Sequence, residues 1–245
     1  MEGCDNDIVS DKMNMVNSSK NSNFVKNLKD EIEKIFYVDD VSGNGIKGQG
    51  DFIKTITSNL RKGKGTGQEI KITKQIKAQE SVILKQIGQE SNLWIESFNE
   101  ENYLDEGAEQ KVYLSGSNVI KINNGLYYES WEDYFISIQL HNILFPNTTY
   151  TLLGLMEKNN ALYIVVQQPY IESTEKYLFE EIKILMEVNG FRNTRNQDFI
   201  NDELGIIVED LHDENVLKQK GIYFFIDTAI YLTNKDKFEI STKQK

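Results

Sequence analysis

The sequence has few of the residues that crosslink a chain or coordinate metal ions. Its 245 residues include one cysteine and two histidines, which excludes an intramolecular disulfide and a structural zinc site with the usual four ligands. No apolar run approaches the roughly 18 residues of a membrane span. The first thirty residues are polar and lack the apolar stretch of a secretory signal. These absences favour a protein of the reducing cytoplasm that has no membrane partner.

Basic residues are scarce in the second part of the chain. Residues 1–95 carry 14 basic and 13 acidic residues, whereas residues 96–245 carry 13 and 25, and the net charge is −11. An acidic surface repels phosphate backbones, so residues 96–245 are a poor candidate for binding nucleic acid. A basic stretch at 61–77 could bind nucleic acid weakly. Its charges alternate with glycines and not with aromatics, which favours a solvated linker.

Composition changes along the chain and indicates its organisation. Residues 1–22 are polar and predict a disordered tail. Residues 23–95 predict a helical N-terminal segment, with helices at 23–37 and 72–95. Seven glycines between them, at 39–68, predict a linker with room for a short apolar helix around 52–60.

From residue 96 the pattern becomes a mixture of strands and helices, typical of an α+β protein. Alternating apolar residues predict strands, several of them in hairpins, and periodicity near 3.6 predicts helices. Pro146 is expected to end the first of these helices because proline cannot continue it. The expected strands are 111–114, 118–122, 150–155, 161–167, 205–208, 215–218 and 223–226, and the expected helices are 129–144 and 173–188.

Four polar residues in this part follow one another in the order of a phosphotransfer site. Lys121 lies inside an expected strand, where a fixed amine can reach phosphate groups. Asp210 and Asn215, separated by four residues, lie on one loop, and Asp227 follows the next strand. Carboxylate and carboxamide oxygens suit Mg²⁺, which also binds a triphosphate, and an aspartate can accept the proton of an attacking hydroxyl.

The chain resembles the kinase-like family, and within it the compact kinase domain found in polyvalent proteins of phages and mobile elements. The resemblance runs from about Gly107 to Ile230. It implies a small two-lobed protein-kinase-like fold of the α+β class, with an N-lobe at 96–168 and a minimal C-lobe at 169–245. A helical, partly disordered N-terminal extension precedes them. The matching words are Gly107-Ala108-Glu109-Gln110, Val119-Ile120-Lys121, Leu140-His141-Asn142, Gln168-Pro169-Tyr170, Asp210-Leu211-His212-Asp213-Glu214-Asn215 and Ile226-Asp227.

The resemblance implies ATP and Mg²⁺ as cofactors and a role for each matching polar residue. Lys121 looks like the lysine that anchors the phosphates, and Asp210 looks like the catalytic base. Asn215 and Asp227 look like the metal ligands. The acceptor of the phosphate is an unknown hydroxyl of a protein or a small molecule.

The same resemblance implies how the nucleotide would be held. Gly107 looks like part of the loop that covers the phosphates. Gln168 to Tyr170 look like the hinge that binds adenine through backbone groups. A carboxylate on the helix at 129–144 is expected to orient Lys121. The three candidates are Glu129, Glu132 and Asp133, with Asp133 preferred.

Departures from the kinase pattern leave two functions open. The expected phosphate loop has one glycine, and few residues follow Asp227. The motif Asp210-Leu211-His212 is more similar to the corresponding motif of small-molecule kinases than to that of protein kinases. The first function is an ATP- and Mg²⁺-dependent phosphotransferase; the alternative is a pseudokinase that serves a mobile element as a nucleotide-binding or protein-interaction module. A metal-dependent hydrolase built on His212 and a glycine loop at 43–48 are weaker interpretations.

Overall fold

A computed structural model describes residues 18–35, 49–63 and 73–233, which form two compact units. The middle unit spans Ile35–Tyr170, and the terminal unit joins Met1–Lys34 with Ile171–Lys245. Helices and antiparallel sheets occur in both units, which confirms the α+β class. The expected N-terminal segment 23–95 is divided, because its first helix belongs to the terminal unit and the next two belong to the middle unit.

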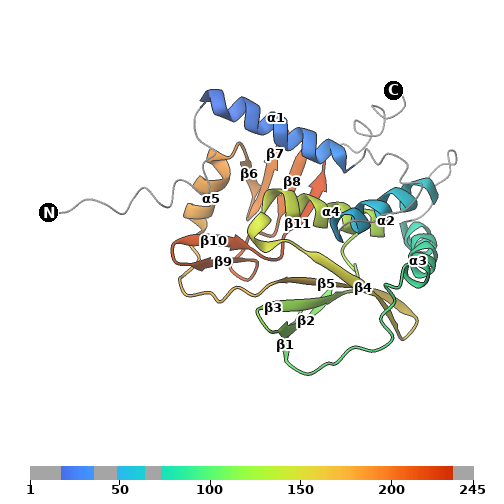
Figure 1. The fold of residues 1–245 in the computed structure, drawn as a ribbon. Helices are drawn as coiled ribbons and strands as arrows, with labels where there is room; N and C mark the ends of the chain where they lie inside the picture. Colours follow the sequence, from blue (N-terminus) through green and yellow to red (C-terminus); the bar gives the residue numbers. More distant parts are fainter. Residues whose placement is uncertain (1–17, 36–48, 64–72, 234–245) are drawn as a thin grey trace. The chain divides into compact units, whose positions relative to one another are not determined.

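A five-stranded antiparallel sheet forms one layer of the middle unit (Figure 1). Its strand order is β1-β2-β3-β5-β4, so β3 lies at the centre and pairs with both β2 and β5. Lys121 of β3 is opposite Val112 on one side and Val166 on the other. The strands are β1 (Tyr103–Glu106), β2 (Gln110–Ser115), β3 (Asn118–Asn123), β4 (Thr151–Lys158) and β5 (Ala161–Pro169).

Two tight turns set the register of these hairpins. Asn159 and Asn160, with φ of 53° and 62°, form the two-residue turn between β4 and β5. Positive φ at both positions defines a type I′ turn, which matches the twist of the paired strands and which asparagine tolerates. Gly116, with φ of 62°, turns the chain between β2 and β3. Both hairpins expected from the sequence are therefore confirmed.

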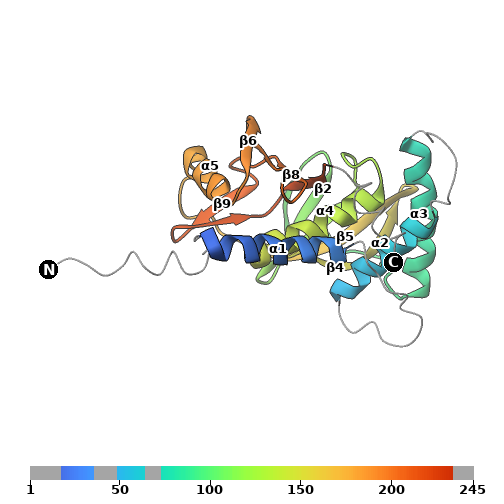
Figure 2. The ribbon, with the colours of Figure 1, turned by 90° about the horizontal axis from the view of Figure 1, so that it is seen from above.

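Three helices pack with this sheet around one apolar core. They are α2 (Gln49–Gly63), α3 (Thr73–Glu90) and α4 (Trp131–Leu144), and Figures 1 and 2 show α2 and α3 beside α4. Ile53, Ile56 and Leu60 of α2 are buried in the core together with α4 and β4. The sequence predicted a short apolar helix around 52–60 within a linker at 39–68; α2 confirms the helix and is longer than expected. The helix forms because its apolar residues, at helical spacing, all find buried contacts; the flanking residues 36–48 and 64–72 lie outside the described part.

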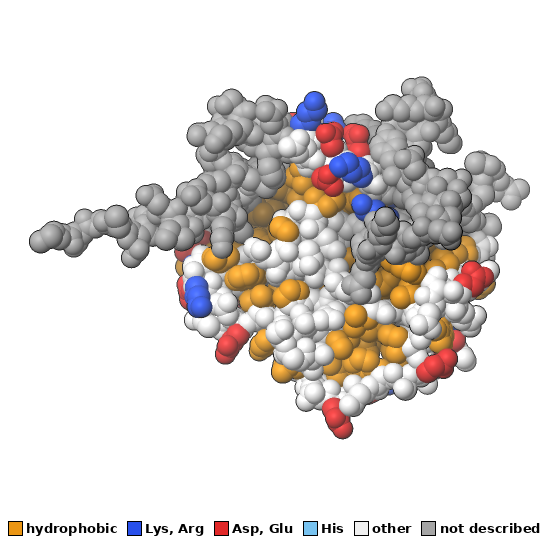
Figure 3. Space-filling model, viewed as in Figure 1, with side chains coloured by type: hydrophobic (Ala, Val, Ile, Leu, Met, Phe, Trp, Pro, Cys, Tyr) orange, Lys and Arg blue, Asp and Glu red, His pale blue; other side chains and the backbone are white. Residues whose placement is uncertain are grey.

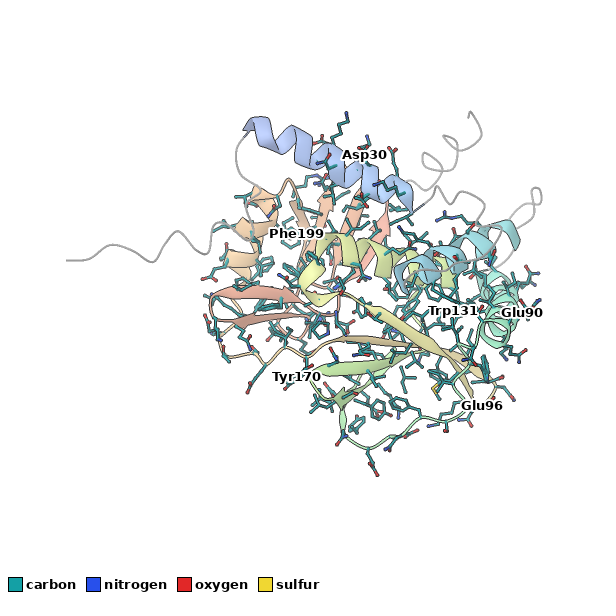
Figure 4. All side chains as sticks on the ribbon, in the orientation of Figure 1. Asp30, Glu90, Glu96, Trp131, Tyr170 and Phe199 are labelled. Carbon is teal, nitrogen blue, oxygen red and sulfur yellow. The ribbon has the colours of Figure 1, made fainter. Side chains whose placement is uncertain are left out.

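Helix α4 is buried on all sides and is fixed by polar contacts from the two preceding helices. The Arg61 guanidinium of α2 lies 2.6 Å from the Glu132 carboxylate, whose side chain is 4% exposed. Glu80 of α3 accepts a hydrogen bond from the backbone N–H of Trp131 at 2.6 Å. Pro146 begins a short 3-10 helix, η1 (Pro146–Thr148), directly after α4, as its sequence position predicted. Figure 4 labels Trp131 near α3.

One glycine of β4 permits a close approach of the chain that follows α3. The Leu155 amide donates to the Leu93 carbonyl at 2.8 Å, and the Ile95 amide donates back to the Leu155 carbonyl at the same distance. A Cβ atom at Gly154 would stand 2.3 Å from the Leu93 carbonyl oxygen. Only glycine therefore fits at this position without a shift of the backbone.

The terminal unit contains two helices and two small antiparallel sheets (Figure 1). The four-stranded sheet has the order β11-β8-β7-β6, and β9 pairs with β10 through a turn at Lys220 and Gly221. Phe199 of β7 is fully buried, and Figure 4 labels it inside this unit. The elements are α1 (Ser18–Lys34), α5 (Phe179–Val188), β6 (Arg192–Arg195), β7 (Asp198–Asn201), β8 (Ile206–Glu209), β9 (Val216–Gln219), β10 (Ile222–Phe225) and β11 (Ala229–Leu232).

Several helix boundaries differ from those the sequence predicts. Helix α3 ends at Glu90 and not at 95. Helix α1 begins at Ser18, five residues before the expected start, because adding a turn to an existing helix avoids the cost of nucleation. Residues 1–17 lie outside the described part. Helix α5 begins at Phe179 and not at 173, because the amides of Thr174 and Glu175 bind the Lys218 carbonyl beside β9. Strands β1, β6, β7 and β11 were not predicted.

Two sequence-based expectations concern the surface: the absence of a membrane span, and the basic stretch at 61–77. No helix in the described ranges is long and apolar enough to cross a membrane. The face drawn in Figure 3 carries acidic and basic side chains interspersed around uncharged surface. The ends of the basic stretch 61–77 make intramolecular contacts: Arg61 binds Glu132, and Lys77 donates to the carbonyls of Gly125 and Tyr128. Most of the stretch lies outside the described residues.

Candidate active site

Lys121 is placed inside the sheet of the middle unit, as the sequence predicted. Its side chain is almost completely buried, with 3% of the residue exposed. The Nζ atom lies 3.4 Å from the Tyr150 hydroxyl and 5.3 Å from the centroid of the Tyr150 ring. Burying a charged amine is costly unless polar groups surround it. The buried amine is therefore a candidate functional group of the middle unit.

A buried polar cluster covers the face of the sheet next to Lys121. His141 Nε2 lies 2.9 Å from the Thr148 carbonyl oxygen, which can only accept, so this nitrogen carries the hydrogen. Gln168 Nε2 donates to the same carbonyl at 2.6 Å. Burial, together with the nearby charge of Lys121, lowers the pKa of His141 to about 3. His141 is therefore neutral at physiological pH and adds no positive charge beside the lysine.

Two of the three acids considered as partners of Lys121, Glu132 and Asp133, have contacts with other residues of the middle unit. Glu132 binds Arg61, as described above. Asp133 takes part in the N-terminal cap of α4: its backbone N–H donates to Ser130 Oγ at 3.0 Å, and its carboxylate accepts from that hydroxyl at 2.6 Å. Glu129 precedes the helix, which begins at Trp131. The preference for Asp133 remains a prediction.

Gly107 and the segment from Gln168 to Tyr170 both belong to the middle unit. Gly107 lies before β2, and Tyr170 binds Ser117, which follows β2. Gly107 begins the turn between β1 and β2, where its amide donates to the Gln110 carbonyl at 2.9 Å. Gln168 and Pro169 end β5, and the Tyr170 amide donates to the Ser117 carbonyl at 3.0 Å. Tyr170 is labelled in Figure 4 and is the last residue of the middle unit. Gln168 itself is 1% exposed, so its side chain forms part of the interior.

In the terminal unit, the loop between β8 and β9 is folded on itself by hydrogen bonds. Asp210, at its start, has a φ of 63°, a conformation that non-glycine residues seldom adopt and that is often found at functional positions. Asn215 Nδ2 donates to the Asp210 carbonyl at 3.0 Å, and the same nitrogen lies 3.1 Å from His212 Nε2. This orientation of the Asn215 amide leaves Oδ1 available for a cation. Residues 210–215 thus form a compact loop with oxygen donors at both ends.

Strand pairing brings Asp227 to the same edge of the terminal unit. The Ile226 amide donates to the Asn215 carbonyl at 2.8 Å, which places the residue before Asp227 directly against the loop. Two residues later, Ala229 of β11 pairs with Glu209 of β8, and Glu209 immediately precedes Asp210. Asp210, Asn215 and Asp227 are therefore neighbours, although 16 residues separate the first from the last.

The surroundings of the loop affect the protonation of two nearby groups. Burial and the charges of Asp198 and Asp210 raise the pKa of Glu209. The Tyr177 hydroxyl donates to the Leu211 carbonyl at 2.5 Å, and burial raises the pKa of this tyrosine to about 12. Tyr177 therefore stays protonated and keeps its hydrogen bond to the loop at any physiological pH.

The donor set fits Mg²⁺ that is shared with a phosphate ligand. In the described ranges, no group of three or more His, Cys, Asp or Glu residues is placed to hold a metal ion. The Asp227 carboxylate and the Asn215 carboxamide are an incomplete shell for Mg²⁺, which in phosphotransfer sites keeps waters and binds substrate phosphates. The same result gives no support to a hydrolase metal site around His212. The glycine loop at 43–48 lies outside the described residues.

A buried lysine on the central strand of an antiparallel sheet, and a loop with Asp and Asn next to a further Asp, are residue types found in the sites of the kinase class. Residues 77–234 match the family model of Serine/Threonine/Tyrosine kinases found in polyvalent proteins, and the chain belongs to this family. The resemblance noted from the sequence is thereby confirmed. Neither a curated protein nor a solved structure matches the chain.

Sequence reasoning missed the residues that support the site. Tyr150 was placed only in a strand, and Asn142 only within a matching word. Tyr177 was assigned to a helix, although it precedes α5 and binds the loop. Each acts through a tertiary contact, and their spacing in the chain carries no signal of it.

Proposed function

We propose that this kinase-family protein transfers a phosphoryl group from ATP to a hydroxyl acceptor and requires Mg²⁺. The observation that carries the proposal is the convergence of Asp210, Asn215 and Asp227 through the pairing of β11 with β8 and the Ile226–Asn215 hydrogen bond. Positioning and charge neutralisation dominate phosphoryl transfer, so a compact set of oxygen donors and one cation meets its main chemical need.

Each residue of the proposal has a distinct task. Asn215 and Asp227 would hold Mg²⁺, which neutralises the charge of the phosphates when bound. Asp210 would accept the hydrogen bond, and then the proton, of the acceptor hydroxyl. Lys121 would supply a fixed positive charge to the phosphates, and its burial supports this role because few waters screen it.

The nucleotide would use backbone groups in two places. The turn that begins with Gly107 would cover the phosphates, and no atom lies within 4 Å of a Cβ built on Gly107. The chain around Gln168 to Tyr170 would contact adenine. Because the Tyr170 amide already donates to the Ser117 carbonyl, the adenine contact would use carbonyl groups or the following amides.

Calorimetric titration with ATP, in the presence and absence of Mg²⁺, tests the binding part. The parent protein should bind ATP in a Mg²⁺-dependent way, and Asp227→Ala should lose most of that dependence. Asp202→Ala is the matched control, because Asp202 is an exposed acid of the same unit that pairs with Arg192. Equal Mg²⁺ dependence in Asp227→Ala and in the parent would contradict the proposal.

Transfer is tested separately with γ-labelled ATP and a panel of protein and small-molecule hydroxyl acceptors, autophosphorylation included. Asp210→Asn should reduce the rate about 10²-fold or more, the size expected for loss of a general base. A folded Asp210→Asn protein that transfers phosphate as fast as the parent would contradict the role of Asp210 as general base.

A pseudokinase is the second candidate, and the single glycine of the β1–β2 turn favours it. One glycine gives the backbone less freedom to approach phosphates than a loop with three. This candidate expects nucleotide binding or stable folding with no phosphate transfer to any acceptor. Measurable transfer that disappears in Asp210→Asn would rule it out.

A further inference from the structure

Lys121 contacts one tyrosine in two ways at the same time. Its Nζ lies 3.4 Å from the Tyr150 hydroxyl oxygen, which can accept a hydrogen bond from the ammonium group. It also lies 5.3 Å from the centroid of the Tyr150 ring, within the range of a cation–π attraction. Lys121 and Tyr150 are 3% and 9% exposed, so little water competes for either contact. One side chain therefore restrains both the position and the direction of the amine.

Tyr150 is in turn fixed by the end of helix α4. Asn142 Nδ2 donates to the Tyr150 carbonyl at 2.8 Å, and Asn142 Oδ1 accepts from the Tyr150 amide at 2.6 Å. Both polar ends of one carboxamide thus bind the main chain of a single residue. The His141 ring packs edge-on against the Tyr150 ring, with centroids 4.7 Å apart. These contacts leave the tyrosine little freedom to move away from the lysine.

We propose that Tyr150 is a positioning residue for Lys121. This inference rests on the proposed role of Lys121 in binding phosphates. Tyr150 is uncharged, so its hydroxyl and ring restrain the amine without adding a negative charge beside an anionic ligand. Asn142 thus fixes the main chain of Tyr150 directly before β4, and Tyr150 in turn holds Lys121.

The first test measures Lys121 in the protein without nucleotide. Tyr150→Phe removes the hydroxyl and keeps the ring, and Tyr128→Phe is the matched control because it removes a hydroxyl bound to Ser137 at 3.1 Å in the same unit. The readout is the rate of acetylation of Lys121 by an N-hydroxysuccinimide ester, mapped by peptide mass spectrometry and normalised to the exposed Lys29. We expect about a 3- to 10-fold faster reaction in Tyr150→Phe alone, the size of one ordinary hydrogen bond, because the contact is long at 3.4 Å. Equal rates in the two variants overturn the proposal.

The second test separates this proposal from the proposed function. Tyr150→Phe should weaken ATP binding by a similar factor of about 3 to 10 and leave adenosine binding unchanged, since only the phosphates contact the lysine. If the parent does not bind ATP but Lys121 is still acetylated faster in Tyr150→Phe, the proposed function fails and the positioning role stands. If Tyr150→Phe does not fold, Asn142→Ala replaces it, and an unchanged acetylation rate in that variant overturns the proposal equally.

Discussion

The ion pair between Arg61 and Glu132 offers a demanding test of how α4 is held. Arg61→Met would leave the Glu132 carboxylate buried in the middle unit without its guanidinium, while most of the apolar stem of the side chain is kept. Removing one partner of a buried pair costs about 3–5 kcal/mol. The Arg61 side chain is 19% exposed, so water can partly replace it. We therefore expect a loss of about 2–4 kcal/mol in the free energy of unfolding.

Urea denaturation followed by tryptophan fluorescence measures this loss for the correct unit. The sequence has two tryptophans, and both Trp94 and Trp131 lie in the middle unit. The double variant Arg61→Met, Glu132→Leu should recover most of the lost stability, because apolar residues of similar size can replace a buried pair.

Lys85→Met is the matched control, since it breaks an ion pair whose partners are each 33% exposed and should cost under about 1 kcal/mol. A loss below about 0.5 kcal/mol in Arg61→Met, or a double variant less stable than the single one, would refute the reasoning.

Two further predictions concern stability. Gly154→Ala should destabilise the middle unit by about 2–3 kcal/mol in the same denaturation assay, because the new Cβ would meet the Leu93 carbonyl at 2.3 Å. Gly107→Ala, where that space is open, should change stability by no more than about 0.5 kcal/mol, and equal effects would contradict the steric argument. Burial lowers the pKa of His141 to about 3, below the value near 6.5 of an unfolded histidine, so the unfolded chain binds more protons between these pH values. The free energy of unfolding keeps the full contribution of neutral His141 above about pH 6.5. It loses this contribution as the pH falls toward 3, by about 3 kcal/mol between pH 7 and 4. In His141→Gln, which keeps a donor for the Thr148 carbonyl, unfolding measured at several pH values should lack this component, and an unchanged pH dependence would exclude it.

Local sequence patterns were sufficient for the best-defined elements. The sequence predicted both hairpins, one around Gly116 and one around Asn159 and Asn160, and the helix that ends before Pro146. It could do so because their alternation, turns and breaks are local. Strands β1 and β6 were missed because Tyr103–Glu106 and Arg192–Arg195 are mostly polar and exposed. Helix α2 was underestimated because the glycines around it dominate the composition.

The candidate site was predictable as a list of residues but not as an arrangement. The spacing of Asp210, Asn215 and Asp227 predicted a shared role. Their proximity depends on the pairing of β11 with β8, and β11 gives no strong signal in a sequence of four residues. The contact of Tyr150 with Lys121 joins positions 29 residues apart through packing of α4 on the sheet. No local pattern encodes such a contact.

Helix α2 also bears on how long a segment of this chain the folded unit requires. The family match begins at residue 77, inside α3, yet Ile53, Ile56 and Leu60 complete the core and Arg61 binds Glu132. A recombination event that moved only the matched region into another polyvalent protein would expose that apolar core and leave a buried acid without its partner. The folded unit is therefore longer than the segment that the family model matches, and it includes α2.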